Sequence, residues 1–252
     1  MTLDGVPVLL CFGLMGDVRA RIGLDYMGAQ ARWLRDQGAL VTRLDLPTSA
    51  AVATNAGRIA DWLRQNPAPA LVIAHSKGGL EALSALCDPT IRCLGFIALQ
   101  SPFHGSPVAD ALAARQRMRL AAGVALRLLG TGSGAGLDDL TTTARTSWMA
   151  ENAAAVAAVV GRLPVLAVGS DVLAAPVPVG DRHYVWMAQW LTTHGVGAND
   201  GLVPVASARL PGAPFLEMPG SHIALIAEGP GHDPVGMLRG VLADFVAATG
   251  PP

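Results

Sequence analysis

Short, continuously apolar runs alternate with segments of helical spacing along this 252-residue chain. The runs at 6–12 (VPVLLCF) and 93–99 (CLGFIAL) show no alternating polar face, which is typical of strands buried on both sides. Strands of a parallel sheet need such burial, and the intervening helices supply the cover. We therefore predict an α/β fold with a mostly parallel central sheet and helices on both faces.

The expected elements can be placed in chain order. Strands are expected at residues 6–12, 39–46, 71–74, 93–99, 163–169 and 213–218, and helices at 28–37, 51–65, 78–87 and 234–248. Residues 170–199 are expected to be irregular. Residues 106–160 contain no good strand and are rich in alanine, leucine and arginine. They predict a helical cap or lid inserted into a core formed by residues 1–105 and 161–252.

Composition excludes several classes of protein. Charged residues make up 15% and hydrophobic residues 51%, as in a globular domain, and the formal net charge of -1 disfavours nucleic acid as a partner. No apolar run reaches the roughly 18 residues that a membrane-spanning helix needs. The N-terminus lacks a basic region before its apolar run, so a cytoplasmic location is expected. The three cysteines (Cys11, Cys87, Cys93) have no metal-binding spacing, so we expect free thiols, no metal and no cofactor.

The segment AHSKG at residues 74–78 lies at a predicted strand-to-helix corner. Small residues, Ala74 and Gly78, stand two positions before and two positions after Ser76. This pattern is typical of a nucleophile elbow, a tight turn that presents a serine hydroxyl above the sheet. The same turn would aim the Lys77 backbone amide at a developing oxyanion. The alternative is that Ser76 simply caps the following helix.

A serine nucleophile needs a histidine base and an acid that orients it, and in this type of fold they follow in the order serine, acid, histidine. His222, in MPGSHIAL near the C-terminus, is the expected base, and His232 is its rival. Asp200, in ANDGLVP, is favoured as the acid. Asp171 competes because it directly follows a predicted strand, and NDG could also be an ordinary turn.

A second oxyanion donor is expected in the loop after the first strand. That loop reads FGLMGD at residues 12–17, and its glycine would permit a close backbone approach. The backbone amide of Leu14 is the expected donor. A plain glycine turn is the alternative.

Taken together, these motifs resemble the bacterial triacylglycerol lipases of the Pseudomonas/Burkholderia type, within the α/β-hydrolase superfamily. The similarity runs in order through FGLMG, AHSKGG, SPFHGSP, the LTT of LDDLTTTARTSWMAEN, NDGLVPVASARL and GSHIAL. It spans most of the chain. The resemblance implies Ser76 as nucleophile, Asp200 as acid and His222 as base.

Three positions depart from the family pattern. Phe12 stands in place of the histidine of the oxyanion loop, which puts the anchoring of that loop in question. Ala224 stands where the family has an aspartate that binds calcium, so calcium is not expected. Lys77 brings a positive charge to a helix N-terminus, where Glu81, one turn later, could be its partner.

The expected activity is hydrolysis of a small-molecule or lipid ester through an acyl-enzyme, with the lid in contact with a lipid interface. Four large side chains could line the pocket, although a place in the core is the default for such residues: Trp148, Met149, Trp186 and Trp190. The alternatives are an acyltransferase or an intracellular polyester depolymerase with the same triad, or a binding protein on a hydrolase scaffold. The sequence does not fix the oligomeric state.

Overall fold

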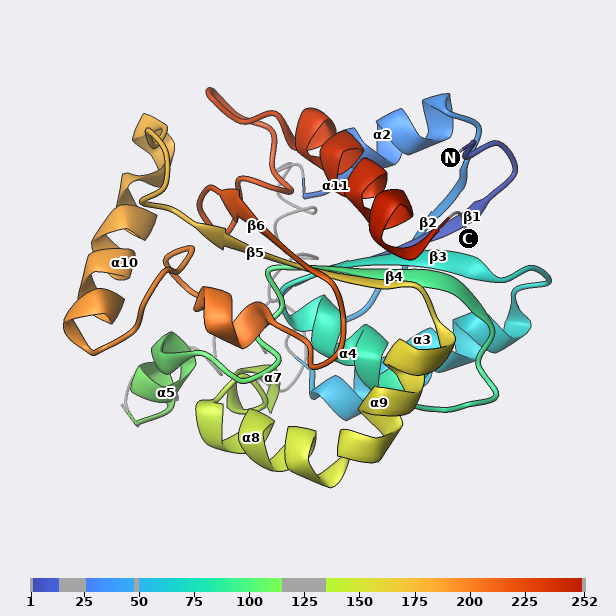
Figure 1. Ribbon diagram of the computed structural model, residues 1–252, viewed down its shortest axis with the longest axis horizontal. Helices are drawn as coiled ribbons and strands as arrows, with labels where there is room; N and C mark the ends of the chain where they lie inside the picture. The colour runs from blue at the N-terminus through green and yellow to red at the C-terminus, as the bar shows by residue number, and fades with distance from the viewer. Residues whose placement is uncertain (1, 14–25, 48–49, 115–134, 251–252) are drawn as a thin grey trace.

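The computed structural model describes residues 2–13, 26–47, 50–114 and 135–250. Six strands in these ranges form one parallel sheet of order β2-β1-β3-β4-β5-β6 (Figure 1). The strands are β1 (Pro7–Cys11), β2 (Leu40–Arg43), β3 (Ala70–His75), β4 (Cys93–Leu99), β5 (Val165–Asp171) and β6 (Phe215–Pro219).

Helices cover both faces of this sheet (Figure 1). One face carries α2 (Gly28–Asp36) and α11 (Pro234–Thr249), and the other carries α3 (Val52–Gln65), α4 (Lys77–Leu86) and α9 (Ala153–Arg162). Successive residues of β3 enter two different core clusters: Val72 and Ala74 join the α3/α4/α9 side, while Leu71 and Ile73 join the α2/α11 side. Burial on both sides explains the continuous apolar runs and confirms the predicted fold class.

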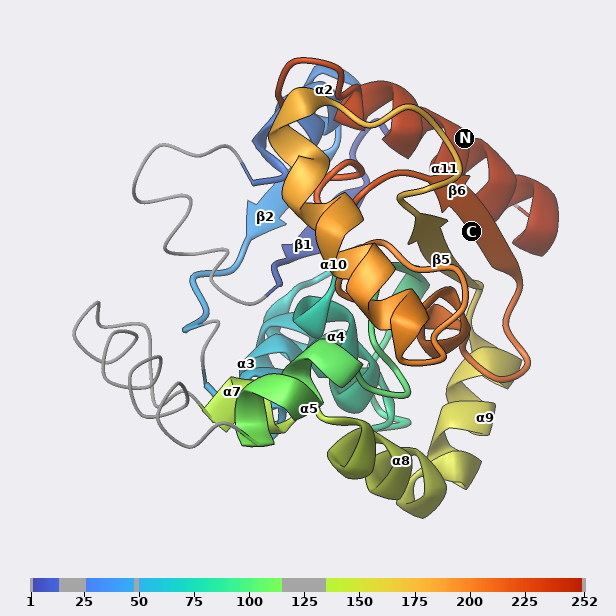
Figure 2. The same cartoon turned by 90° about the vertical axis from the view of Figure 1, so that its left-hand side faces the viewer.

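The other helices of the described ranges lie near the carboxyl ends of the strands, the side that faces the viewer in Figure 2. They are α5 (Pro107–Ala114), α7 (Ala135–Asp138), α8 (Thr142–Glu151) and α10 (Arg182–Thr193), with two short 3-10 turns, η1 (Val179–Asp181) and η2 (Val205–Ala208). Within the predicted insertion, Val156 and Val159 of α9 pack into the same cluster as the core strands. The boundaries of the insertion and its role as a lid stay predictions.

The sequence-based interpretation was wrong at α10. Residues 170–199 were expected to be irregular, but this stretch contains a twelve-residue helix. Its buried residues, Tyr184, Ala188 and Leu191, keep helical spacing. The pattern is obscured because Trp186 and Trp190, on the same helix, are exposed. The second strand is also shorter than expected, because only four residues pair with β1 at the sheet edge.

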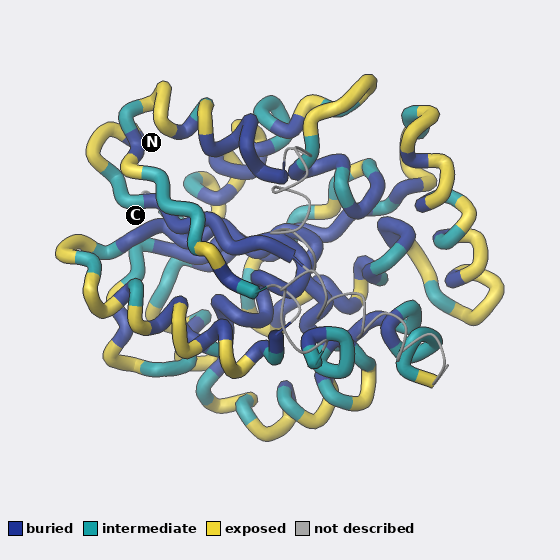
Figure 3. The backbone as a smooth tube through the Cα atoms, turned by 180° about the vertical axis from the view of Figure 1, so that it is seen from behind, coloured by how far each residue is buried: buried dark blue, intermediate teal, exposed yellow. Residues whose placement is uncertain are grey.

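The core lies within the sheet and on the inner faces of the helices, whose outer faces are exposed (Figure 3). Cys11, Cys87 and Cys93 are free thiols, as predicted, and Cys11 is fully buried. No helix in the described ranges is both long and apolar enough to cross a membrane.

Candidate active site

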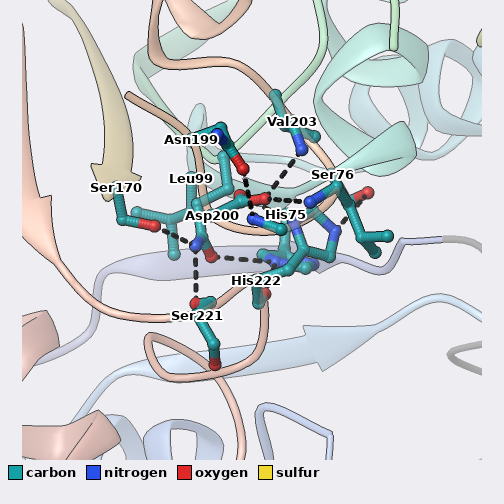
Figure 4. Close-up of polar contacts among 12 residues, drawn as sticks. His75, Ser76, Leu99, Ser170, Asn199, Asp200, Val203, Ser221 and His222 are labelled. Carbon is teal, nitrogen blue, oxygen red and sulfur yellow. Dashed lines mark hydrogen bonds and ion pairs between the residues drawn. The ribbon is translucent and has the colours of Figure 1, made fainter. Parts of the chain in front are cut away.

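Ser76 occupies a one-residue corner between β3 and α4. Its backbone has φ 55° and ψ −127°, a conformation that L-residues rarely adopt and that marks local strain. Its amide donates to the carbonyl of Leu99 at the end of β4, which ties the corner to the sheet (Figure 4). A Cβ on Gly78 would lie 2.5 Å from the carbonyl oxygen of Phe12, so only glycine fits two residues after the serine. The small residue inferred from the sequence therefore has a direct steric cause.

The structure brings Ser76, His222 and Asp200 together (Figure 4). Nε2 of His222 lies 3.0 Å from Oγ of Ser76, and its Nδ1 lies 2.8 Å from Oδ2 of Asp200. Ser76 follows β3, His222 lies in the loop after β6, and Asp200 lies in the loop before η2. All three residues are buried. Burial strengthens the interaction between the imidazole and the carboxylate because little water screens it.

Backbone contacts fix the Asp200 carboxylate. Its Oδ1 accepts hydrogen bonds from the amides of Leu202 at 2.8 Å and Val203 at 2.7 Å. The backbone amide of His222 donates to the Asp200 carbonyl at 3.0 Å. These contacts leave Oδ2 directed at the imidazole, and they orient the ring toward Ser76.

The rival residues lie elsewhere. Asp171 accepts a hydrogen bond from the amide of Leu173 at 3.0 Å, in a local turn at the end of β5. His232 pairs with Asp181 rather than with a serine of the elbow, at 2.8 Å from Nε2 to Oδ2. In the described ranges, the imidazole and the carboxylate that contact each other beside Ser76 are those of His222 and Asp200.

Phe12 and Gly13, directly after β1, lie beside the elbow. Phe12 is buried against Tyr26, edge to face with ring centroids 5.6 Å apart, so aromatic packing anchors the position where the family has a histidine. The amide of Gly13 donates to the Tyr26 hydroxyl at 3.0 Å. Leu14, the expected second oxyanion donor, lies outside the described residues. The amide of Lys77 opens α4, where the first N–H groups of a helix have no acceptor within the helix.

Sequence reasoning missed a layer of polar side chains beside His222. Nε2 of His75 lies 2.9 Å from the backbone oxygen of His222 and so must donate to it. Nδ1 of His75 meets the Tyr26 hydroxyl. The side-chain amide of Gln100 donates to the Ser221 carbonyl at 2.9 Å. His75 adjoins the nucleophile in the sequence, which was the available signal, but no motif pointed to Tyr26 or Gln100.

A mainly apolar cavity opens at Ser76 and His222. Its apolar walls come from α5, α7 and the loops around Asp200 and His222, and include Val108, Leu112, Leu137, Leu140, Val203 and Ile223. None of the four large side chains considered for the pocket lines this cavity. Met149 is buried in the core and Trp148 packs against it, whereas 77% of the Trp186 surface is exposed.

Lys77 has the partner that the sequence suggested. Its ammonium group pairs with the Glu81 carboxylate one turn later, and both side chains are buried. Asn55 of α3 donates to the same carboxylate at 2.8 Å. The lysine side chain therefore points into the core, while its backbone amide opens α4.

The residues near the loop after β6 do not fit a calcium site of the lipase type. Ala224 offers no ligand oxygen from its side chain, and Oδ2 of nearby Asp181 is already bound by Ser221 and His232. Calcium needs six to eight oxygen ligands. No group of three or more metal-binding side chains occurs in the described ranges.

The arrangement at Ser76 can perform general-base chemistry. The unprotonated Nε2 of His222 can accept the serine proton, and Asp200 can stabilise the imidazolium that results. The adjoining helix N-terminus offers backbone N–H groups to a developing negative charge.

No protein-family model matches the sequence. No curated protein matches it either. Solved structures do match. A Bacillus licheniformis lipase in its mature form aligns over 87% of this chain and 85% of its own, with a TM-score of 0.64 and 23% identity. In its propeptide form, 46% of the lipase chain is covered.

Two metagenomic enzymes give further matches. A carboxyl esterase aligns over 97% of this chain and 75% of its own, with a TM-score of 0.69 and 19% identity. An α/β hydrolase from lagoon sediments aligns over 97% and 91%, with a TM-score of 0.51 and 14% identity. These likenesses show that the chain has the α/β-hydrolase fold.

Proposed function

We propose that this protein is a serine hydrolase of carboxylic esters, of the lipase or esterase type. The observation that carries the proposal is the hydrogen-bonded line from Ser76 through His222 to Asp200, at the wall of an apolar cavity. Ser76 is the proposed nucleophile, His222 the base and Asp200 the acid. The lipase and the carboxyl esterase described above share the fold and support this choice of reaction.

The proposed reaction has two halves. The Ser76 oxygen attacks the ester carbonyl carbon as its proton passes to Nε2 of His222, and the tetrahedral intermediate then expels the alcohol, which takes that proton. The product is an acyl-enzyme on Ser76. In the second half, His222 removes a proton from water, the hydroxide attacks the acyl carbon, and the Ser76 oxygen leaves with the proton. The carboxylic acid is released.

Two backbone amides would stabilise the oxyanion in both halves. The Lys77 amide opens α4 directly after the nucleophile, and the Leu14 amide is the proposed second donor. Each such donor is worth roughly 10²- to 10³-fold in kcat in serine hydrolases. Because both donors are backbone groups, the lysine side chain can be buried with Glu81 without loss of the donor.

The apolar cavity walls suit an ester with an apolar acyl chain better than one with a polar acyl group. Leu112 of α5, Leu137 of α7 and Leu140 face the same cavity as Ser76. These residues belong to segment 106–160, which we propose as a lid over a core of residues 1–105 and 161–252, facing a small-molecule or lipid ester.

The test is hydrolysis of p-nitrophenyl esters from acetate to palmitate by the wild type and by Ser76→Ala. Activity that disappears with the hydroxyl supports the proposal, and its extension to long chains supports the acyl cavity. A fluorophosphonate probe provides a second reading because it labels an activated serine whatever the substrate. A wild type that neither cleaves esters nor reacts with the probe would refute the proposal.

A further inference from the structure

A second acid–histidine pair lies next to the loop that carries His222. The Asp181 carboxylate, at the end of η1, accepts a hydrogen bond from the Ser221 hydroxyl. Nε2 of His232 lies 2.8 Å from the same oxygen, Oδ2. Only 3% of the Asp181 side chain and 7% of the His232 side chain are exposed, so water does not compete for these contacts.

The pair joins three separate segments of the chain. Asp181 directly precedes α10, Ser221 directly precedes His222, and His232 lies two residues before α11. Ser221 is held from two directions, because its carbonyl accepts from the Gln100 side chain at 2.9 Å while its hydroxyl donates to Asp181. Ser221, the residue before His222, is therefore fixed through both its backbone and its side chain.

Within the described ranges, the His232 ring has one polar contact, with Asp181. Its Nδ1 is buried and has no hydrogen-bond partner in the described part of the chain. Nε2 must carry a proton to bind the carboxylate, so the ring acts as a donor to Asp181. A carboxylate that receives two donors is more strongly fixed than one that receives the serine hydroxyl alone.

We propose that Asp181 and His232 are positioning residues that hold the His222 loop in the geometry needed for proton transfer. The inference rests on the proposed function, since His222 must act as the base for its position to affect the rate. Neither residue touches Ser76. They act through Ser221, and a displacement of His222 by about 1 Å is enough to cost roughly 10²-fold in rate.

The experiment compares His232→Leu with His232→Gln. The leucine has no donor for Asp181, whereas the glutamine amide can replace the imidazole N–H. On p-nitrophenyl butyrate we expect His232→Leu to lower kcat at least about tenfold with KM nearly unchanged, and His232→Gln to recover most of that loss. His194→Leu is the matched control, because His194 is an exposed histidine that packs on Trp190 instead.

Circular dichroism must first show that each variant is folded. If His232→Leu does not fold, Asp181→Leu replaces it, because this variant removes the acceptor for both Ser221 and His232 with little change in side-chain size. A folded His232→Leu with the wild-type kcat would overturn the inference, and so would equal losses in the leucine and glutamine variants.

A readout that does not require turnover separates this inference from the proposed function. The His222 amide donates to the Asp200 carbonyl at 3.0 Å, and its hydrogen exchange reports on the position of the loop. We expect exchange at least about tenfold faster in His232→Leu and near the wild-type rate in His232→Gln. An inactive wild type would refute ester hydrolysis alone, whereas unchanged exchange in the leucine variant would refute the positioning role.

Discussion

Lys77 and Glu81 form an ion pair that is almost completely removed from solvent, with exposed side-chain fractions of 0% and 1%. The pair lies in the first turns of α4, immediately after the proposed nucleophile. Asn55 adds one hydrogen bond to Oε1 of Glu81, but Oε2 is buried without a partner in the described ranges. The pair therefore anchors the start of the helix, although the desolvation of both charges opposes its stability.

Breaking this pair on one side should cost more than removing it. Glu81→Leu strands a buried ammonium group and Lys77→Met strands a buried carboxylate, and we expect each to lower the free energy of unfolding by about 3–5 kcal/mol. The double variant Lys77→Met/Glu81→Leu should lie within about 1–2 kcal/mol of the wild type, because no unpaired charge remains. Urea denaturation of all four proteins measures the coupling. Losses that simply add in the double variant would contradict this account.

The same carboxylate should make stability depend on pH. Burial raises the pKa of Glu81 above its ordinary value of 4.5, although Lys77 and Asn55 act in the opposite direction. Between the ordinary and the raised pKa, the unfolded chain has released this proton while the folded chain still holds it. The contribution of Glu81 to stability is therefore fully present below about 4.5 and is lost as the pH rises through the raised pKa.

Glu81→Gln should remove this dependence. We expect the free energy of unfolding of the wild type to fall, relative to that of Glu81→Gln, as the pH rises from about 4 to about 7. The comparison cancels the titration of the other carboxyl groups, which both proteins share. A difference that stays constant or grows with pH would show that the pKa of Glu81 is not raised.

The elbow could be inferred from the sequence because its steric requirement is local. Gly78 faces the carbonyl oxygens of Cys11 and Phe12, so the small residue is required by the neighbouring strand β1 itself. The polar layer of Tyr26 and Gln100 could not be inferred in this way. Those side chains reach the site only once the sheet has formed, and no sequence motif or residue spacing indicates these contacts.

Helix α10 shows a second limit of sequence reasoning. Its inward face is marked by three buried residues, but an exposed Trp186 and a partly exposed Trp190 lie outside that face and break the amphipathic pattern. Periodicity detects a helix only when the outward face is polar. The sheet strands were easier to predict because burial on both faces leaves an unbroken apolar run.

Gly78→Ala should destabilise the protein strongly, since the added Cβ would lie 2.5 Å from the Phe12 carbonyl oxygen and 2.7 Å from that of Cys11. Backbone oxygens cannot swing away as a flexible side chain could. We expect a loss of about 1–3 kcal/mol in the free energy of unfolding, together with a loss of esterase activity.

Gly57→Ala is the matched control for this substitution. Gly57 lies on the exposed side of α3, and a Cβ there would have no atom within 4 Å. Because alanine is the better helix former, this variant should gain up to about 1 kcal/mol. Thermal unfolding of both variants measures the difference, and a loss at Gly57 equal to that at Gly78 would show that the contact with β1 is not the cause.

The choice of Asp200 over Asp171 as the acid leads to the sharpest kinetic prediction. In Asp200→Asn, the side-chain oxygen would still accept from the amides of Leu202 and Val203, so the amide nitrogen would face Nδ1 of His222. That nitrogen donates, which forces the ring proton onto Nε2 and removes the acceptor for the Ser76 proton. We expect kcat to fall roughly 10³- to 10⁴-fold with the fold intact.

Asp171→Asn supplies the comparison, because this carboxylate accepts from the Leu173 amide in a turn, which an asparagine oxygen can also do. Its kcat should stay within about twofold of the wild type, since the substitution keeps this contact and lies away from Ser76. Steady-state kinetics on p-nitrophenyl butyrate decides between the two. A large loss at Asp171 with little change at Asp200 would move the acid to the end of β5, and His222 would then need a partner other than the carboxylate it contacts at 2.8 Å.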